Sequence, residues 1–130
     1  YRGWGSDLTT ERTPGESGLD AMIKPNHSYT GDTALAQRMQ DPARWEMVLL
    51  DIDTQGFDPF YAHSIHCEGR AVGIVTSGAY GHRTGQTLAL AYLRERGLRD
   101  GLSVEILGRP CSAHVLERAP YDPDNLRLKG

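Results

Sequence analysis

Short apolar segments separated by tight-turn signals recur through the second part of this chain. Glu68-Gly69 and Gly108-Arg109-Pro110 each join two such segments, and glycine supplies the positive φ angle that a hairpin turn needs. Strand signals at short intervals with hairpin turns are typical of a small antiparallel barrel. We therefore predict such a barrel after residue 43, with strands over residues 45–52, 63–67, 70–77, 87–93, 103–107 and 111–116.

The first part of the chain has a different pattern. Residues 1–16 combine glycines and a proline with polar side chains, which indicates a loop. A short strand is expected over residues 17–23. Residues 32–39 read as a helix, and Thr30 just before them is a suitable N-cap.

Two further features complete the expected helix. Leu35 and Met39 are four residues apart, so they should share its buried face, and Asp41-Pro42 should end it. The expected fold class is mainly β, with a short α+β segment at residues 1–42 followed by a barrel domain at residues 43–130.

Charge and cysteine content narrow the function classes. The 130 residues hold 14 Lys+Arg against 17 Asp+Glu, a net charge of -3, with no block of like charges. This argues against a non-specific nucleic-acid binder, which needs a concentrated basic face. No apolar run approaches the roughly 18 residues of a membrane span. Cys67 and Cys111 make no disulfide framework, so a reducing cytoplasm is the expected compartment.

The glycine-rich stretch 75–93, VTSGAYGHRTGQTLALAYL, invites comparison with a phosphate-binding loop. A Walker A loop ends in Gly-Lys-Ser/Thr, whereas this stretch has Gly85-Gln86-Thr87 and lacks the lysine that neutralises phosphate. A dinucleotide fingerprint needs G-x-G-x-x-G, and the spacing here is G-x-x-G-x-x-x-G. We interpret the stretch as two barrel strands with a wide connection between them, the first ending at Gly78.

Histidines and cysteines cluster in two of the expected hairpin arms. His63, His66 and Cys67 lie in one arm, and Cys111 and His114 lie in the last one. Residues three apart on a strand point to opposite faces. His63 and His66 therefore cannot ligate one metal without a bulge, and the same holds for Cys111 and His114. Packing and surface polarity explain them better, and an independent metal-binding domain is kept as an alternative.

Three carboxylates, Asp7, Glu11 and Glu16, lie in the glycine-rich opening of the chain. Their ordinary explanation is a solvated loop. Glu16 stands out because of the motif around it.

That motif is one of several that occur in order along nearly the whole chain. They are GWGSDLTTERTPGESGLD at 3–20, YTGDTAL at 29–35, GRAVGIVTSG at 69–78, QTLALAYL at 86–93 and YDPDN at 121–125. Together they resemble the C-terminal part of the glycine cleavage T-protein (aminomethyltransferase) family. The opening YRGWG and the ending RLKG are most similar to the C-terminal regions of dimethylglycine and sarcosine dehydrogenase-like flavoproteins.

The resemblance implies a folate-dependent function. Family members bind tetrahydrofolate and pass to it a one-carbon unit from an aminomethyl or N-methyl donor. The glutamate of the family's T-P-x-E motif contacts the pterin, and it corresponds to Glu16. A carboxylate suits this role because it can accept two hydrogen bonds from the N–H edge of a pterin. Arg44 and Arg127 are the nearest candidates for the family's folate-carboxylate contacts.

The resemblance also implies what lies elsewhere. Residues 1–42 would end the folate-binding domain, and the catalytic aspartate would lie upstream of Tyr1. FAD, where present, would occupy a separate upstream domain. The expected partners are therefore folate and the remainder of the same polypeptide, and residues 1–130 alone should be catalytically inert. The alternative is a non-catalytic docking barrel without a folate site.

Overall fold

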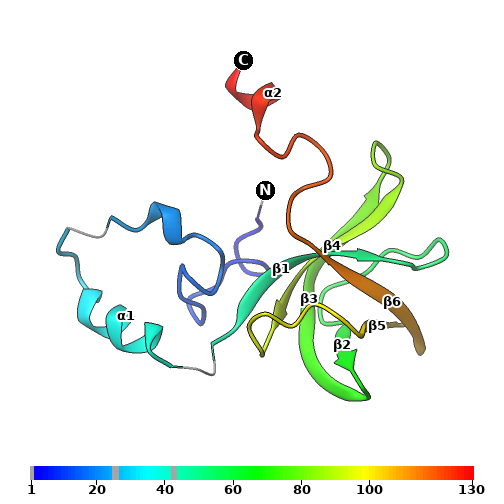
Figure 1. Cartoon of the computed structure of the whole chain (residues 1–130), viewed down its shortest axis with the longest axis horizontal. Helices are drawn as coiled ribbons and strands as arrows, with labels where there is room; N and C mark the ends of the chain where they lie inside the picture. Colours follow the sequence, from blue (N-terminus) through cyan, green and yellow to red (C-terminus); the bar gives the residue numbers. More distant parts are fainter. Residues whose placement is uncertain (1, 25–26, 42–43) are drawn as a thin grey trace.

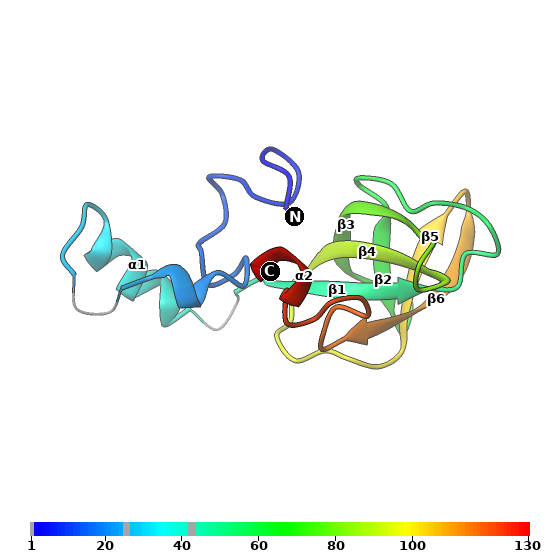
Figure 2. The same ribbon diagram turned by 90° about the horizontal axis from the view of Figure 1, so that it is seen from above.

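The computed structural model describes residues 2–24, 27–41 and 44–130. Figure 1 shows the strands gathered into one body, with η1 and α1 standing to one side of it, and Figure 2 shows the same arrangement from above. The elements in chain order are η1 (Asp20–Met22), α1 (Asp32–Met39), β1 (Glu46–Ile52), β2 (Ser64–Cys67), β3 (Arg70–Gly81), β4 (Gln86–Leu93), β5 (Leu102–Ile106), β6 (Arg109–Leu116) and α2 (Leu126–Lys129).

The strands close into a barrel in the order β1-β4-β3-β2-β5-β6, and every pairing is antiparallel. Side chains alternate between its interior and its surface. Along β1, for example, Val48, Leu50 and Ile52 are buried and the residues between them are partly exposed. These inward side chains fill the interior with aliphatic groups from all six strands. The predicted mainly β fold with a small antiparallel barrel is confirmed.

The connection between β3 and β4 differs from the prediction. β3 continues to Gly81 and β4 begins at Gln86, so a short hairpin replaces the wide loop. Gly78 lies inside β3, and the position suits glycine because a Cβ there would collide with Pro59. At Gly81 a Cβ would lie 2.6 Å from Thr84 Oγ1. These glycines therefore permit close packing rather than binding phosphate.

The turn between β5 and β6 also differs by two residues. Leu107 and Gly108 form it, with φ angles of 50° and 72°, and Arg109 and Pro110 already belong to β6. Pro110 is tolerated there because β1 pairs with β6 only from Ala113 onward, so the missing proline N–H interrupts no second ladder.

The predicted Glu68-Gly69 turn between β2 and β3 is confirmed, and it offers a stability test. Both residues have positive φ, 50° for Glu68 and 78° for Gly69. Asparagine tolerates this conformation better than glutamate does. We expect Glu68→Asn to raise the free energy of unfolding by about 0.5 kcal/mol, measured by urea denaturation. Glu117→Asn, which removes the same charge just after β6, should leave it unchanged; an equal gain there would assign the effect to charge.

The expected strand at residues 17–23 is wrong. Backbone hydrogen bonds fold this stretch into tight turns that lead into η1: Ser17 N–H donates to Thr13 O and Leu19 N–H donates to Pro14 O. The helical turn forms because Thr13 and Glu16 bond to each other locally. Short apolar runs cannot be assigned by periodicity alone, and here local hydrogen bonding decides.

The expected helix at residues 32–39 is confirmed as α1, but its cap and its buried face are not. The N-cap is Gly31, with φ 93°, and Thr30 provides no side-chain cap. Met39 is 46% exposed, and no residue of α1 is buried, since α1 stands apart from the barrel. The predicted stop at Pro42 and the predicted domain boundary between residues 42 and 43 lie outside the described residues.

Candidate functional site

Glu16 closes a single helical turn that begins at Thr13. Glu16 Oε2 accepts hydrogen bonds from the Thr13 N–H and O–H, both at 2.9 Å, and the Glu16 N–H donates to Thr13 Oγ1 at 3.2 Å. This reciprocal arrangement is a capping box, and Pro14 occupies the next position, where its missing N–H is not needed. The T-P-x-E motif therefore has a local structural role as well as any role in binding.

Glu16 also joins this turn to the start of β1. Its Oε1 accepts a hydrogen bond from Trp45 N–H at 3.1 Å and faces Arg38 Nη2 at 3.3 Å. Its backbone carbonyl accepts from Met47 N–H at 2.8 Å. The residue is only 1% exposed. Both carboxylate oxygens are thus engaged within the chain.

The charge of Glu16 is preserved despite its burial. Burial alone would raise the pKa of this carboxyl, but hydrogen bonds from Thr13 and Trp45, together with the Arg38 guanidinium, hold the pKa below its ordinary value. Glu16 is therefore ionised at neutral pH.

Arg44 lies beside the same turn and is 6% exposed. Its Nη1 donates to Met39 O at 3.2 Å, and its Nη2 lies only 2.7 Å from where a Cβ on Gly15 would be. Any larger residue at position 15 would displace the guanidinium. Arg44 Nε is buried without a hydrogen-bond partner among the described residues, which is costly for a cationic group.

Asp7 is a buried carboxylate that the sequence analysis assigned to a solvated loop. It is 2% exposed, and its Oδ1 accepts hydrogen bonds from Thr76 Oγ1 at 2.6 Å and Ser77 Oγ at 2.8 Å. Its Oδ2 accepts the Gly3 N–H at 2.7 Å. Burial would raise the pKa of Asp7, but these bonds hold it below its ordinary value. The W-G-x-D and V-T-S-G motifs, far apart in the chain, meet at this carboxylate.

Tyr92 on β4 adds a third link between the first segment and the barrel. Its hydroxyl donates to Asp7 O at 2.8 Å. Ser17 Oγ lies 2.8 Å from the same hydroxyl and must act as donor, because the tyrosine proton is already used. Burial raises the pKa of Tyr92 above its ordinary value.

Two arginines lie against the Trp45 ring at this junction. The guanidinium carbon of Arg12 is 4.3 Å from the ring centroid, and that of Arg94 is 5.1 Å from it. Such contacts stabilise modestly at partly exposed sites. Their positive charges lie over the ring of the residue whose backbone N–H bonds to Glu16.

Arg127 lies in a different part of the molecule. Its guanidinium is 5.5 Å from the Tyr121 ring, which Arg83 of the β3–β4 hairpin approaches at 5.3 Å. α2, which carries Arg127, is set apart from the other helices in Figure 1. The structure therefore brings Glu16 and Arg44 together, and places Arg127 against Tyr121 instead.

The histidines and cysteines do not converge on a metal. Within residues 2–24, 27–41 and 44–130, no group of three or more His, Cys, Asp or Glu side chains could hold an ion. His63 Nδ1 instead accepts the Phe60 N–H at 3.0 Å, and both Cys67 and Cys111 are free thiols.

Comparison with known proteins identifies the barrel. The model of the glycine cleavage T-protein C-terminal barrel domain matches residues 46–122, which contain all six strands. The chain belongs to this family. The T-protein barrel explains the V-T-S-G motif in structural terms, because its two hydroxyls hold the buried Asp7.

Longer relatives match almost the whole chain, including the segment before the T-protein barrel. Rat dimethylglycine dehydrogenase is 33% identical over 137 residues, covering 99% of this chain and 16% of the relative. Mouse sarcosine dehydrogenase is 28% identical over 141 residues, covering 100% of this chain and 15% of the relative. The chain thus spans about a sixth of the length of these curated relatives. The predicted resemblance is confirmed.

A solved structure shows the same fold. The glycine cleavage system aminomethyltransferase T from Bartonella henselae superposes with a TM-score of 0.79 at 22% identity, over 95% of this chain and 36% of that one. The barrel strands lie between Glu46 and Leu116. Because the superposition covers 95% of the chain, it also includes residues outside the T-protein barrel.

The names of the relatives bear on the compartment. Both dehydrogenases are named as mitochondrial proteins. In the part of the chain that the structure describes, no helix has the length and apolar character needed to cross a membrane. The expected cytoplasmic location stays a prediction.

Proposed function

We propose that this chain is the C-terminal part of a tetrahydrofolate-dependent aminomethyltransferase-like enzyme of the dimethylglycine or sarcosine dehydrogenase type. Such an enzyme moves a one-carbon unit from an N-methyl amine to tetrahydrofolate, with FAD in a separate upstream domain. The observation that carries the proposal is the junction at which Glu16 and Arg44, two residues with an implied folate role, meet beside β1.

In this proposal residues 1–42 complete a folate-binding domain and residues 43–130 form the barrel domain. The uncovered side of the first segment supports this division. Met22 is 77% exposed and Met39 is 46% exposed, and a broad hollow between η1 and α1 is lined partly by apolar side chains. The upstream remainder of the same polypeptide would cover these groups.

Glu16 would accept hydrogen bonds from the N–H edge of the pterin. Its carboxylate is already saturated, so one present donor has to leave. Arg38 is the donor best able to do so, because its bond is the longest at 3.3 Å, its side chain is 39% exposed and it also pairs with Asp41. We therefore expect folate to displace Arg38 from Glu16 and leave it on Asp41.

The arginines would bind the carboxylates of the folate tail. Arg44 has a buried Nε whose hydrogen-bonding capacity is unused among the described residues, so a ligand oxygen there would satisfy it. Arg127 would have to leave the Tyr121 ring, a weak exposed contact, to reach the same ligand.

Folate titration of the full-length enzyme tests these roles. Arg38→Ala should tighten tetrahydrofolate binding about two- to fivefold, because it removes a competing ion pair whose arginine is partly exposed. Glu16→Ala should weaken binding at least about tenfold through lost charge-assisted hydrogen bonds. Isothermal titration calorimetry measures both.

Arg70→Ala is the control, because it also removes an arginine from an ion pair, the one with Glu95 at 3.5 Å, and Arg70 makes no contact with Glu16 within the described residues. It should leave folate affinity unchanged. If Glu16→Ala and Arg38→Ala both bind folate as the wild type does, the pterin role of Glu16 is wrong.

The saturated carboxylate of Glu16 also favours the second candidate, a docking barrel that has lost its folate site. In that case Glu16 serves only to hold the first segment on β1. Failure of the wild-type full-length enzyme to bind tetrahydrofolate would support this candidate over the first.

A further inference from the structure

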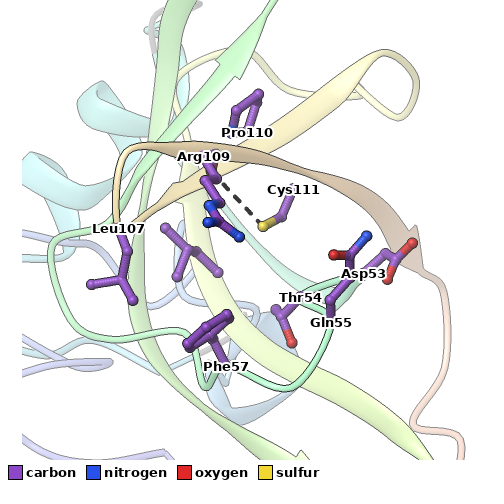
Figure 3. A pocket seen from close by; sticks show the side chains of 9 residues that line it. Asp53, Thr54, Gln55, Phe57, Leu107, Arg109, Pro110 and Cys111 are labelled. Carbon is purple, nitrogen blue, oxygen red and sulfur yellow. Dashed lines mark hydrogen bonds between the residues drawn. The ribbon is translucent and has the colours of Figure 1, made fainter.

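A separate hollow lies at the other end of the barrel from Glu16. Trp45, which contacts Glu16, precedes β1, whereas Asp53 at the hollow follows β1, and a strand of this length spans about 20 Å. The hollow has a volume of ≈ 310 Å³, near the lower end of small-molecule pockets. Its lining comes from the loop after β1 and from the β5–β6 hairpin, and Figure 3 shows these two segments facing each other across it.

One part of the lining is apolar. Ile106 is 2% exposed and belongs to the barrel core. Phe57 and Leu107 are 45% and 74% exposed, so their side chains still offer apolar surface to a ligand. Figure 3 shows the Phe57 ring below the Arg109 guanidinium. A small aliphatic or aromatic group could be covered here.

The other part carries two opposite charges that do not pair. Neither the Arg109 guanidinium nor the Asp53 carboxylate makes an ion pair or a side-chain hydrogen bond within the described residues. Arg109 extends from β6 and Asp53 from the loop after β1, and Figure 3 shows their charged ends well apart. Gln55, with an amide that can donate or accept, lies on the same side as Asp53.

Such a lining discriminates by charge. An anion without a positive group would meet the Asp53 carboxylate, and a cation without a negative group would meet the Arg109 guanidinium. A zwitterion can face each with its opposite charge, and an apolar side chain can cover Phe57 and Leu107 at the same time.

We propose that this hollow binds a small zwitterionic α-amino acid with an apolar side chain. Its carboxylate is held by Arg109, its ammonium group by Asp53, and its side chain packs against Phe57 and Leu107. The site is separate from the proposed folate site and does not depend on it.

Calorimetry and ligand-detected NMR on the whole protein test the proposal with three probes of one shape. Leucine has both charges, 4-methylpentanoate lacks the ammonium group, and 3-methylbutylamine lacks the carboxylate. We expect leucine to bind with a dissociation constant below about 1 mM, and each analogue to bind about tenfold or more weakly. Equal binding of all three, or no leucine binding, would overturn the proposal.

Substitutions locate the site. Arg109→Gln and Asp53→Asn should each weaken leucine binding about tenfold or more. Arg109→Gln should also reduce the preference for leucine over 3-methylbutylamine, which lacks the carboxylate. Asp53→Asn should reduce the preference for leucine over 4-methylpentanoate, which lacks the ammonium group. Phe57→Ala should weaken leucine binding while preserving that preference.

Arg96→Gln is the matched control, because Arg96 is exposed on the loop after β4 and does not line the hollow. It should bind leucine as the wild type does. Circular dichroism checks that every variant is folded. Leucine binding that Arg109→Gln and Asp53→Asn leave unchanged would place the ligand elsewhere and overturn the assignment.

Discussion

Glu16→Ala is expected to release the first segment from the barrel while the barrel itself stays folded. The substitution removes the acceptor for Thr13, Trp45 and Arg38 and leaves buried donors unpaired. Breaking a buried, paired charge of this kind costs about 3 kcal/mol or more. The Met47 amide, which donates to Glu16 O, should therefore exchange with solvent about a hundredfold faster in hydrogen-exchange mass spectrometry or NMR.

The barrel amides are the internal control. Val104 lies in the core on β5, distant in sequence from this junction, and its exchange should not change. Uniform acceleration of all amides would mean that Glu16 stabilises the whole fold, and no acceleration at Met47 would mean that the segment is held by other contacts.

The contribution of Glu16 should depend on pH in one direction. Its folded pKa lies below the ordinary value of 4.5, so the ionised form is the one that the fold prefers. The stability advantage over Glu16→Gln is therefore present above the unfolded pKa and is lost as the pH falls through the folded pKa. Urea denaturation of both proteins from neutral pH to about pH 3 measures this.

Asp7→Ala is expected to have an effect of similar size at the other contact between segment and barrel. It removes charge-assisted hydrogen bonds from Thr76, Ser77 and Gly3. Each such bond contributes about 1.5–3 kcal/mol, and part of this is recovered because the Thr76 hydroxyl can still donate to Leu90 O at 3.1 Å. Net destabilisation of about 3 kcal/mol should make trypsin cleave after Arg12 many times faster.

A double-mutant cycle attributes the effect to the V-T-S-G motif. Asp7→Ala combined with Thr76→Val should show a coupling energy of about 1 kcal/mol or more. Glu11→Ala, which removes an exposed carboxylate from the same segment, should leave cleavage unchanged. Strict additivity of the Asp7 and Thr76 substitutions would contradict the assigned contact.

The strands were the most predictable part of this fold. Short apolar segments between turn signals locate strands such as β1 and β4, because one face of each strand must enter a core. The errors lie at ends and connections. The sequence predicted that the strand ends at Gly78 and that Gly81 lies in a loop, yet β3 continues to Gly81, and the missing side chains of these glycines make room for Pro59 and Thr84. The contact of Gly78 with Pro59 joins positions well apart in the chain and leaves no local pattern.

The candidate site was predictable in part. The resemblance selected Glu16 and Arg44, and the structure places them at one junction. It did not select Asp7, because a carboxylate in a glycine-rich stretch normally faces solvent. Nor could spacing show that Arg127 would lie on Tyr121, since that contact depends on how the last turn folds back.

The sequence by itself determined the family, the mainly β character and the small antiparallel barrel, because periodic apolar residues and glycine turns act over a few neighbouring positions. Only the tertiary structure decided which carboxylates are buried and what they hold. Asp7 meets Thr76 and Ser77, and Glu16 meets Trp45, through hydrogen bonds between positions far apart in the chain. Burial makes those bonds strong, and burial is a property of the folded chain as a whole.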